Sequence, residues 1–313
     1  AGECGGSAII DCSGVCGGSD VLDDCGICNG DSSTCSGCMN SDANNYDDSA
    51  TVDDGSCNYE GNYSLNFDGV NDLITVADSD VLDGYSEGTW SAWIKVNSLP
   101  SAGGWNTPAG IVEKWIAHNS ENNVSRNLFL GIAVDGRLRF SVGNSQGNYC
   151  QAYSTTNFGD HLDSWHHVAG VFESDGETKV YVNGQFESSC DAQGPMGSNG
   201  YPLKIGVATE FGDTQSPKYF DGLIDELTIW NRALTEEEIL LKVIEQQLIP
   251  EEEVGLMGYW LFDDVPGNTL IDLSGNGNNG TITGAAWTDD VPILIAGCTD
   301  SLGDNYDPSA SYN

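Results

Sequence analysis

The run Trp165-His-His-Val-Ala-Gly-Val-Phe172 is followed closely by Lys179-Val-Tyr-Val182 and then directly by Asn183-Gly184. Both runs are rich in the β-branched and aromatic residues that fit a pleated sheet. Asn-Gly tolerates the positive φ angles that a tight hairpin requires. The stretch therefore predicts strands, with a hairpin at Asn183-Gly184.

Short apolar or alternating runs continue on both sides of this stretch. Asp135-Gly136 lies between two of them and predicts a second hairpin. The other runs are 73–76, 89–96, 127–134, 137–142, 203–207 and 223–230. Many short strands at close spacing predict an all-β fold, an antiparallel β-sandwich.

One short helix is expected among the strands. Thr235 is its N-cap, and Glu238 three residues later completes a capping box. Leu234 is placed to contact Ile239 as a hydrophobic staple, and Pro250 lies just beyond the end. The buried stripe is predicted to comprise Ile239, Leu240, Val243 and Ile244.

The composition is strongly acidic, because 48 Asp and Glu face 10 Lys and Arg among 313 residues, for a formal charge of −38. Such a chain repels nucleic acid and anionic membranes, and we expect divalent cations to neutralise it. Residue Ala1 is followed by no basic or apolar leader, and no run reaches the roughly 18 apolar residues of a membrane span. We expect no membrane insertion, and a processed product or a piece of a longer chain.

Nine of the 11 cysteines lie outside the central region, in Gly-, Asp- and Ser-rich sequence with few apolar residues. Crosslinks must replace a core there, which indicates an oxidising, extracellular location. Residues 1–59 are predicted to form such a module, followed by a sandwich over 60–292. Cys150 and Cys190 lie within the sandwich, where a structural disulfide is favoured over two reactive thiols.

A second acidic cysteine motif begins in residues 293–313. The segment from Cys38 to Cys57 reappears from Cys298 onward, and the second copy stops before its closing cysteine. If another copy of residue 1 followed residue 313, Cys4 would take the place of Cys57 without a gap. The chain is then one period of a tandem array or head-to-tail polymer, or else a fragment cut within the motif.

In the periodic interpretation Cys38 pairs with Cys57, and Cys298 pairs with Cys4 of the next unit. The odd cysteine count then leaves one thiol unassigned among Cys12, Cys16, Cys25, Cys28 and Cys35. The acidic motifs also offer hard oxygen ligands for calcium, although a solvated loop held by its disulfide is the alternative. These candidate ligands are Asp42, Asn44, Asp47 and Asp53 in the first copy and Asp304 and Asp307 in the second.

Five motifs in order resemble the laminin G-like, concanavalin A-like jelly-roll family, and the resemblance extends over about residues 62–292. They are Asn66-Phe-Asp-Gly-Val-Asn-Asp-Leu-Ile-Thr-Val, Thr89-Trp-Ser-Ala-Trp-Ile, Ser164-Trp-His-His-Val-Ala-Gly-Val, Val180-Tyr-Val-Asn-Gly and Asp221-Gly-Leu-Ile-Asp-Glu-Leu-Thr-Ile-Trp-Asn-Arg-Ala-Leu-Thr. The resemblance implies a structural calcium held by Asp68, Asn71 and Asp225. The alternative is that Asp68 and Asn71 form turns and Asp225 caps a strand. The cysteine modules are similar to thrombospondin type 3-like repeats of bacterial surface proteins.

The sequence offers little catalytic chemistry. The Glu-x-Asp-x-x-Glu arrangement of glycan hydrolases with this fold is absent, so we expect no enzyme. His166 and His167 lie in a strand motif with no zinc-ligand spacing nearby, which indicates a structural role. Trp105 and Trp115 flank a loop and are candidates for stacking on sugar rings. The six tryptophans expected in the core are Trp90, Trp93, Trp165, Trp230, Trp260 and Trp287.

Sequons at Asn62, Asn123 and Asn279 are candidate glycosylation sites, although chance also explains three such triplets. Together these features predict a repeat or subunit of a calcium-stabilised extracellular filament or giant surface adhesin, joined to copies of itself. The alternative is a module of a secreted protein that binds glycans or surface proteins through rim loops within 98–126 or 144–163.

Overall fold

The computed structural model of the protein divides into two compact units, Ala1–Gly61 and Asn62–Asn313. The structure describes residues 10–23, 25–30, 35–37, 47, 49–53, 63–101, 108–115, 126–144, 148–173, 175–191, 194–209, 217–244, 248–263 and 267–292.

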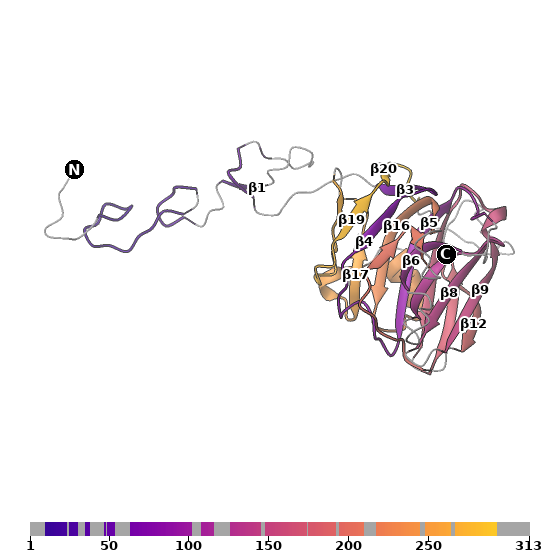
Figure 1. The fold of residues 1–313 in the computed structure, drawn as a ribbon. Coiled ribbons are helices and arrows are strands. Elements are labelled where there is room, and N and C mark those ends of the chain that lie inside the picture. The colour runs from indigo at the N-terminus through magenta and orange to yellow at the C-terminus, as the bar shows by residue number, and fades with distance from the viewer. Residues whose placement is uncertain are drawn as a thin grey trace, which may run out of the picture. The chain divides into compact units, whose positions relative to one another are not determined.

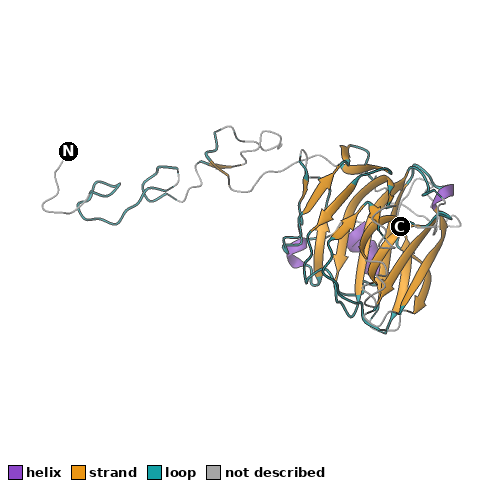
Figure 2. Ribbon diagram, viewed as in Figure 1, coloured by secondary structure: helices purple, strands orange, loops and turns teal. Residues whose placement is uncertain are grey.

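The second unit is a sandwich of two eight-stranded sheets (Figure 1, Figure 2). Across the first sheet the strands are β12 (Gln185–Asp191), β11 (Glu177–Val182), β10 (Trp165–Phe172), β5 (Gly88–Val96), β16 (Asp221–Trp230), β3 (Ser64–Asp68) and β20 (Ala286–Thr288), with β17 (Leu256–Trp260) also pairing with β16. Across the second they are β18 (Thr269–Leu270), β19 (Gly280–Thr283), β4 (Leu73–Val76), β13 (Leu203–Ile205), β6 (Ala109–Trp115), β7 (Arg126–Ile132), β8 (Arg137–Gly143) and β9 (Tyr149–Asn157). The predicted all-β, antiparallel jelly-roll architecture is confirmed.

Smaller elements complete the chain. Strands β14 (Val207–Ala208) and β15 (Lys218–Tyr219) form an antiparallel pair, and β1 (Ser36–Gly37) and β2 (Val52–Asp53) form a parallel pair in the first unit. Single 3₁₀ turns lie at Phe158–Asp160 and Pro250–Glu252. In the part of the chain that the structure describes, the helices are too short and too polar to cross a membrane.

Both predicted hairpins are present. The turn at Asp135-Gly136 joins β7 to β8, and the turn at Asn183-Gly184 joins β11 to β12. Gly136, Asn183 and Gly184 all have positive φ angles, of 85°, 50° and 76°. The two central residues of the second turn therefore match the type of hairpin that Asn-Gly favours.

The main core lies between the two sheets. Trp90 from β5 packs on Phe140 from β8, with ring centroids 5.8 Å apart. Gly170 stands over the same phenylalanine, and a Cβ added to it would lie 2.3 Å from the ring. The close approach of β10 to the facing sheet thus requires glycine.

A second apolar cluster covers the outer face of the first sheet. Trp93 and Trp230 contribute to it, and the chain after β16 covers it with Leu234, Ile239 and Ile244. The predicted helix begins there with Thr235 as N-cap and a complete capping box, runs over Glu236–Glu238, and continues as a π-helical turn over Ile239–Ile244. Of the predicted core tryptophans, Trp90, Trp93, Trp230 and Trp260 are buried, whereas Trp165 and Trp287 are half-buried.

The edges of the two sheets are joined along one side. Cys150 of β9 and Cys190 of β12, the pair expected from the sequence, form a disulfide. Glu187 of β12 accepts hydrogen bonds from the backbone N–H groups of Thr155 and Thr156 of β9, at 2.7 and 2.9 Å. A crosslink over 40 residues stabilises the folded chain by about 3 to 4 kcal/mol, mainly by constraining the unfolded state.

Lys114 is one of two buried cationic residues among the described residues of the sandwich, the other being Arg139. Its ammonium group is 1% exposed and contacts Asp78 at 2.5 Å, Asp83 at 2.8 Å and the backbone carbonyl of Asn199 at 2.9 Å. All three ammonium protons therefore have acceptors, as a buried charge requires. The arrangement fixes the loop after β4 and the segment before β13 to strand β6.

Candidate functional site

A pocket of about 640 Å³ opens at the end of the sandwich where β3 and β5 finish and β16 begins. Asp68 and Gly69 come from the turn after β3, and Asp221 is the first residue of β16. The remaining walls come from the loop after β5 and from β15, which give the pocket apolar, aromatic, hydroxyl and charged surfaces. They are Val70, Ser98, Leu99, Pro100, Ser101, Pro217, Lys218 and Tyr219.

Asp68 and Asp221 lie directly opposite each other across β3 and β16. Such neighbours have Cβ atoms about 5 Å apart, and like charges in this position repel. Hydrogen bonds fix both carboxylates. Asp68 Oδ1 accepts the N–H groups of Val70 and Asn71 at 2.8 and 3.2 Å, and Asp221 Oδ2 accepts the hydroxyl of Ser98.

Gly69 allows these two strands to approach. Its φ is +72°, and a Cβ at this position would lie 2.8 Å from the Cβ of Asp221. Its N–H donates to the backbone carbonyl of Phe220 at 3.1 Å. Position 69 of the pocket lining therefore requires glycine, because only glycine combines this conformation with this space.

The expected calcium ligands Asp68, Asn71 and Asp225 do not form one group. Asp68 and Asn71 share the turn after β3, as the alternative interpretation expected, whereas Asp225 lies four residues beyond Asp221 along β16, about 13 Å away. The structure therefore places Asp225 apart from the turn that holds Asp68 and Asn71, and the calcium site implied by the resemblance stays a prediction. The sequence does not reveal whether two residues from different motifs lie at the same end of a sheet.

Asp225 instead belongs to a carboxylate group with Glu226, which is also buried, and Asp263, which is half-buried. Its side chain is 1% exposed, and its Oδ2 has no hydrogen-bond partner among the described residues. Burial, together with the smaller effect of the charges of Glu226 and Asp263, raises the pKa of Asp225 to about 10. Asp263 also accepts the N–H of Tyr63 at 2.8 Å.

The backbone at this group is irregular. Glu226 has a φ of +49°, and the pairing of β16 with β5 shifts register between Asp225 and Thr228. Asp225 and Glu226 are both buried, as are all the residues of β16 after Asp221, and the bulge breaks the regular alternation of side chains at this point. Within the described ranges, no three His, Cys, Asp or Glu side chains converge in a ready-made metal site.

A polar row continues from Asp225 across the same sheet. Asp225 pairs with Trp93 of β5, which pairs with His167 of β10. The rings of Trp93 and His167 meet edge to face with centroids 5.6 Å apart, and none of their three ring nitrogens has a hydrogen-bond partner in the described part of the chain. Complete burial lowers the pKa of His167 to about 3, so the ring stays neutral and packs as part of the structure.

The first unit contains two copies of a twelve-residue loop, in which Asp11 and Asp23 occupy the same position. Asp11 Oδ1 accepts the N–H of Val15 at 2.8 Å, and Asp23 Oδ1 accepts the N–H of Ile27 at 2.8 Å. The Val15 hydrogen bond is the main reason that the pKa of Asp11 is lowered. Each carboxylate thus organises its own turn.

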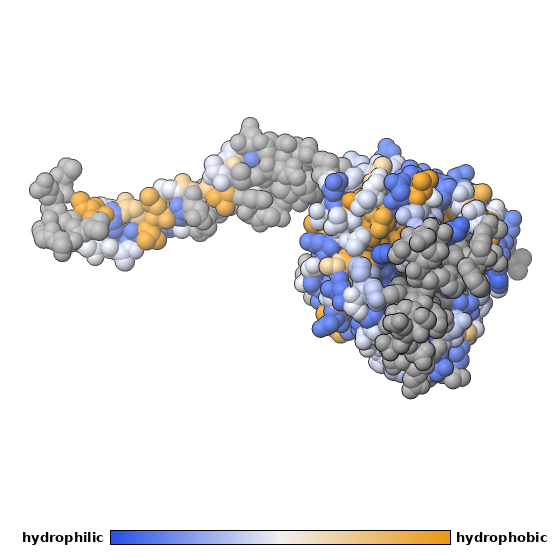
Figure 3. Space-filling view, viewed as in Figure 1, coloured by the Kyte–Doolittle hydropathy of each residue, from blue (hydrophilic) through white to orange (hydrophobic). Residues whose placement is uncertain are grey.

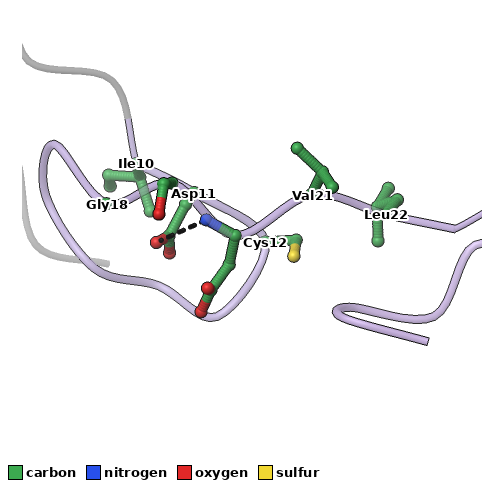
Figure 4. Close-up of a pocket in the computed structure, with 8 residues that line it drawn as sticks. Ile10, Asp11, Cys12, Gly18, Val21 and Leu22 are labelled. Carbon is green, nitrogen blue, oxygen red and sulfur yellow. Dashed lines mark hydrogen bonds between the residues drawn. The ribbon is translucent and has the colours of Figure 1, made fainter.

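A shallow pocket of about 550 Å³ lies beside the first loop (Figure 4). Ile10, Val21 and Leu22 line it together with Asp11, whose Oδ2 accepts the N–H of Asp20 at 3.4 Å. Hydrophobic residues also reach the surface along this unit (Figure 3), and Val21 is 69% exposed. This unit therefore relies on turns and crosslinks, with little apolar burial.

The cysteines of the first unit correct the expectation of an unassigned thiol. Cys12 bonds to Cys28, and Cys25 bonds to Cys35. Cys16 is also disulfide-bonded, and its partner lies outside the described residues. All five of these cysteines are oxidised, so none of them is the odd thiol.

Several predicted residues cannot be placed. Outside the described residues lie Cys4, Cys38, Cys57 and Cys298, Asp42, Asn44, Asp304 and Asp307, Trp105, and the sequons at Asn62 and Asn123. Asp53 and Trp115 are described only in their backbone, in β2 and β6. Asp47 accepts the N–H and hydroxyl of Ser49, which lowers its pKa, and Asn279 is exposed and accepts the N–H of Asp272.

The sequence interpretation missed several residues of the pocket and the carboxylate group. Asp263 stands in the motif Trp-Leu-Phe-Asp, and an acidic residue after three apolar ones is a signal that could have been noticed. Glu226 is adjacent to Asp225 in the Asp221–Trp230 strand. Ser98 and Tyr219 have no local signal, because they reach the pocket only through the pairing of distant strands.

A family model described as the concanavalin A-like lectin/glucanases superfamily matches residues 67–240. The human adhesion G-protein coupled receptor D1 is 34% identical over 77 residues, which are 25% of this chain and 9% of the receptor. The chain therefore spans only a small part of that relative.

Among solved structures, a candidate carbohydrate-binding protein from Bacteroides ovatus superposes with a TM-score of 0.56 at 20% identity. The match covers 77% of this chain and 63% of that chain, less than two thirds of its length. A heptameric SAP-like pentraxin from Limulus polyphemus gives a TM-score of 0.43 at 17% identity, over 58% of this chain and 82% of that chain. At these identities the likeness shows the fold alone.

Asp225 should make the sandwich less stable as pH rises in the presence of a chelator. Its pKa is about 10 in the folded chain and about 4 when unfolded, so across this interval the folded state keeps a proton that the unfolded state has released. The free energy of unfolding should therefore fall from about pH 4 upward, by up to about 1.4 kcal/mol per pH unit. Asp225→Asn should remove this dependence and be more stable than the parent at about pH 8.

Urea unfolding at about pH 5 and about pH 8 measures this effect. Asp80→Asn, a change at an exposed aspartate, is the matched control and should follow the parent. Equal pH slopes for the parent and Asp225→Asn would contradict the assignment.

Proposed function

The chain belongs to the concanavalin A-like lectin/glucanases superfamily, and we propose that its sandwich is a non-catalytic glycan-binding module of an extracellular protein. The observation that carries the proposal is the pocket at the end of the sandwich, where two fixed carboxylates stand beside Tyr219 and apolar side chains. Sugars present hydroxyl donors on their edges and an apolar face, and such a mixed concave surface suits both. The candidate carbohydrate-binding protein with a similar fold supports the same class of ligand.

The extracellular location rests on the disulfides. Cys12–Cys28, Cys25–Cys35 and Cys150–Cys190 are formed. Disulfides persist in oxidising compartments, and the first unit, with its exposed apolar residues, has few other interactions to hold its loops. We assign the first unit the role of a crosslinked acidic connector that carries the sandwich.

Glycan arrays probed with the purified chain in calcium test the binding proposal. The parent should bind a defined set of glycans, and Tyr219→Ala should weaken binding about threefold to tenfold by removing aromatic contact with the sugar. Tyr201→Ala is the matched control, because Tyr201 is an exposed tyrosine that does not line the pocket. No binding above background by the parent would refute the proposal, and hydrolysis of a bound glycan would refute the non-catalytic part.

Calcium is proposed as the cation of the carboxylate group at Asp225, Glu226 and Asp263. Carboxylate oxygens are the ligands that calcium prefers, and the buried Asp225 Oδ2 has no other partner among the described residues. A divalent cation would favour the ionised form of Asp225 and offset the repulsion of its neighbours. Because three side chains do not converge on their own, binding must adjust this group or recruit carbonyl oxygens or water.

A melting experiment with calcium tests this site. Calcium at about 100 times its dissociation constant should add about 2.7 kcal/mol to the stability of the parent. Asp225→Asn should lose most of the rise in melting temperature, Asp80→Asn should keep it, and magnesium should be less effective. A rise of equal size in Asp225→Asn would place the calcium elsewhere.

A second candidate function is a filament or a giant adhesin built from copies of the chain. It rests on a sequence observation, the return of the Cys38–Cys57 motif from Cys298 onward. Such an assembly would combine a shaft of crosslinked connectors with repeated binding modules.

Electron microscopy of native material, with and without a chelator, tests the filament. Regular fibres that loosen on removal of calcium are expected. Intact mass under reducing conditions then separates a tandem polypeptide from subunits of 33.2 kDa. Dispersed single particles in calcium would exclude assembly and leave the binding module.

A further inference from the structure

The chemistry of the end pocket restricts the kind of sugar that it can hold. Asp68 and Asp221 place two carboxylates in it, with Lys218 as the only basic residue among those that line it. The whole chain has a formal charge of −38, so the surrounding field also repels anions. Sialylated, uronic or sulfated sugars are therefore repelled both by the net negative charge of the chain and by the two carboxylates of the pocket.

The hydrogen bonds of the pocket also bear on how a ligand is held. Asp68 Oδ1 is occupied by two backbone N–H groups, and Asp221 Oδ2 is occupied by Ser98. These bonds orient both carboxylates before a ligand arrives. A carboxylate accepts up to about four hydrogen bonds, so each can still accept a sugar hydroxyl.

A bridging cation is not needed for such contacts. The pocket combines these two carboxylates with Tyr219, prolines and hydroxyl side chains, and no metal-binding group of three side chains is found where the structure is described. Hydrogen bonds from neutral hydroxyls to charged acceptors are about twice as strong as those between neutral groups. Lys218 offsets the charge of one of the two carboxylates.

We propose that the pocket binds an uncharged sugar directly, through hydroxyl groups that donate to Asp68 and Asp221, without a bridging calcium ion. This inference rests on the proposed glycan-binding function and names its ligand class and mode of contact. Val70 and Leu99 provide apolar contact for the carbon-bound face of the ring. Recognition then depends on hydrogen-bond geometry, and charge serves to exclude acidic glycans.

Asp68→Asn is a sharp test because asparagine keeps an oxygen for the turn and replaces the other oxygen by a donor. The turn hydrogen bonds from Val70 and Asn71 should survive, whereas a sugar hydroxyl would lose its acceptor. Binding of a neutral oligosaccharide found on the array should weaken at least about tenfold. Asp80→Asn, an exposed aspartate outside the pocket, should bind like the parent.

Salt and chelator arms complete the experiment, measured by calorimetry on the full chain. The affinity for the neutral oligosaccharide should not change between low and high salt, because no charge on the ligand is screened. A chelator should leave the affinity unchanged at a temperature where circular dichroism shows the chain still folded. A matched sialylated or sulfated oligosaccharide should not bind.

The possible results distinguish a failure of this inference from a failure of the glycan-binding function on which it rests. If no glycan binds, the glycan-binding function itself fails. If a neutral glycan binds but Asp68→Asn is unaffected, or binding disappears with the chelator in folded protein, direct recognition is wrong. Preference for an anionic or an amino sugar would overturn the ligand class while leaving a binding module.

Discussion

Strand β16 is the constraint on which the rest of the sandwich depends, because it pairs with three neighbours. Its first half pairs with β3, its second half with β17, and β5 runs along its other side. Its first residue, Asp221, lines the end pocket, and Asp225 and Glu226 are buried at its bulge. Its last residue, Trp230, belongs to the outer cluster that the helical segment covers. One strand therefore positions both candidate sites and the packing between them.

The bulge of β16 lies at the carboxylate group that is expected to affect both the stability of the sandwich and the proposed binding of calcium. A regular strand turns adjacent side chains to opposite faces, and the register shift after Asp225 breaks this alternation. Asp225 and Glu226 are both buried at this irregular backbone, and one oxygen of Asp225 is unpaired among the described residues. Unfavourable backbone conformations and buried unpaired polar atoms persist at functional sites because the pairing of the surrounding strands holds them in place.

Short sequence signals predicted the fold well. The candidate sites were harder to predict from the sequence, because they depend on pairing between strands that are far apart in the chain. Alternating runs, the turns at Asp135-Gly136 and Asn183-Gly184 and the capping box at Thr235 are all encoded within a few residues. The opposition of Asp68 and Asp221 depends on strands more than 150 residues apart in sequence, and no single motif records it. The resemblance grouped Asp68 and Asp225 as calcium ligands, and only the strand register shows that they lie in different places.

The contacts between β9 and β12 affect how neighbouring copies of the chain would behave at high concentration. Both are edge strands of their sheets, and an exposed edge offers unpaired N–H and C=O groups to any passing strand. Here side chains of β12 occupy those groups on β9, since Glu187 accepts from Thr155 and Thr156 and the Ser188 hydroxyl donates to the carbonyl of Tyr153. Many copies held close together could therefore sit side by side without fusing their sheets into aggregates.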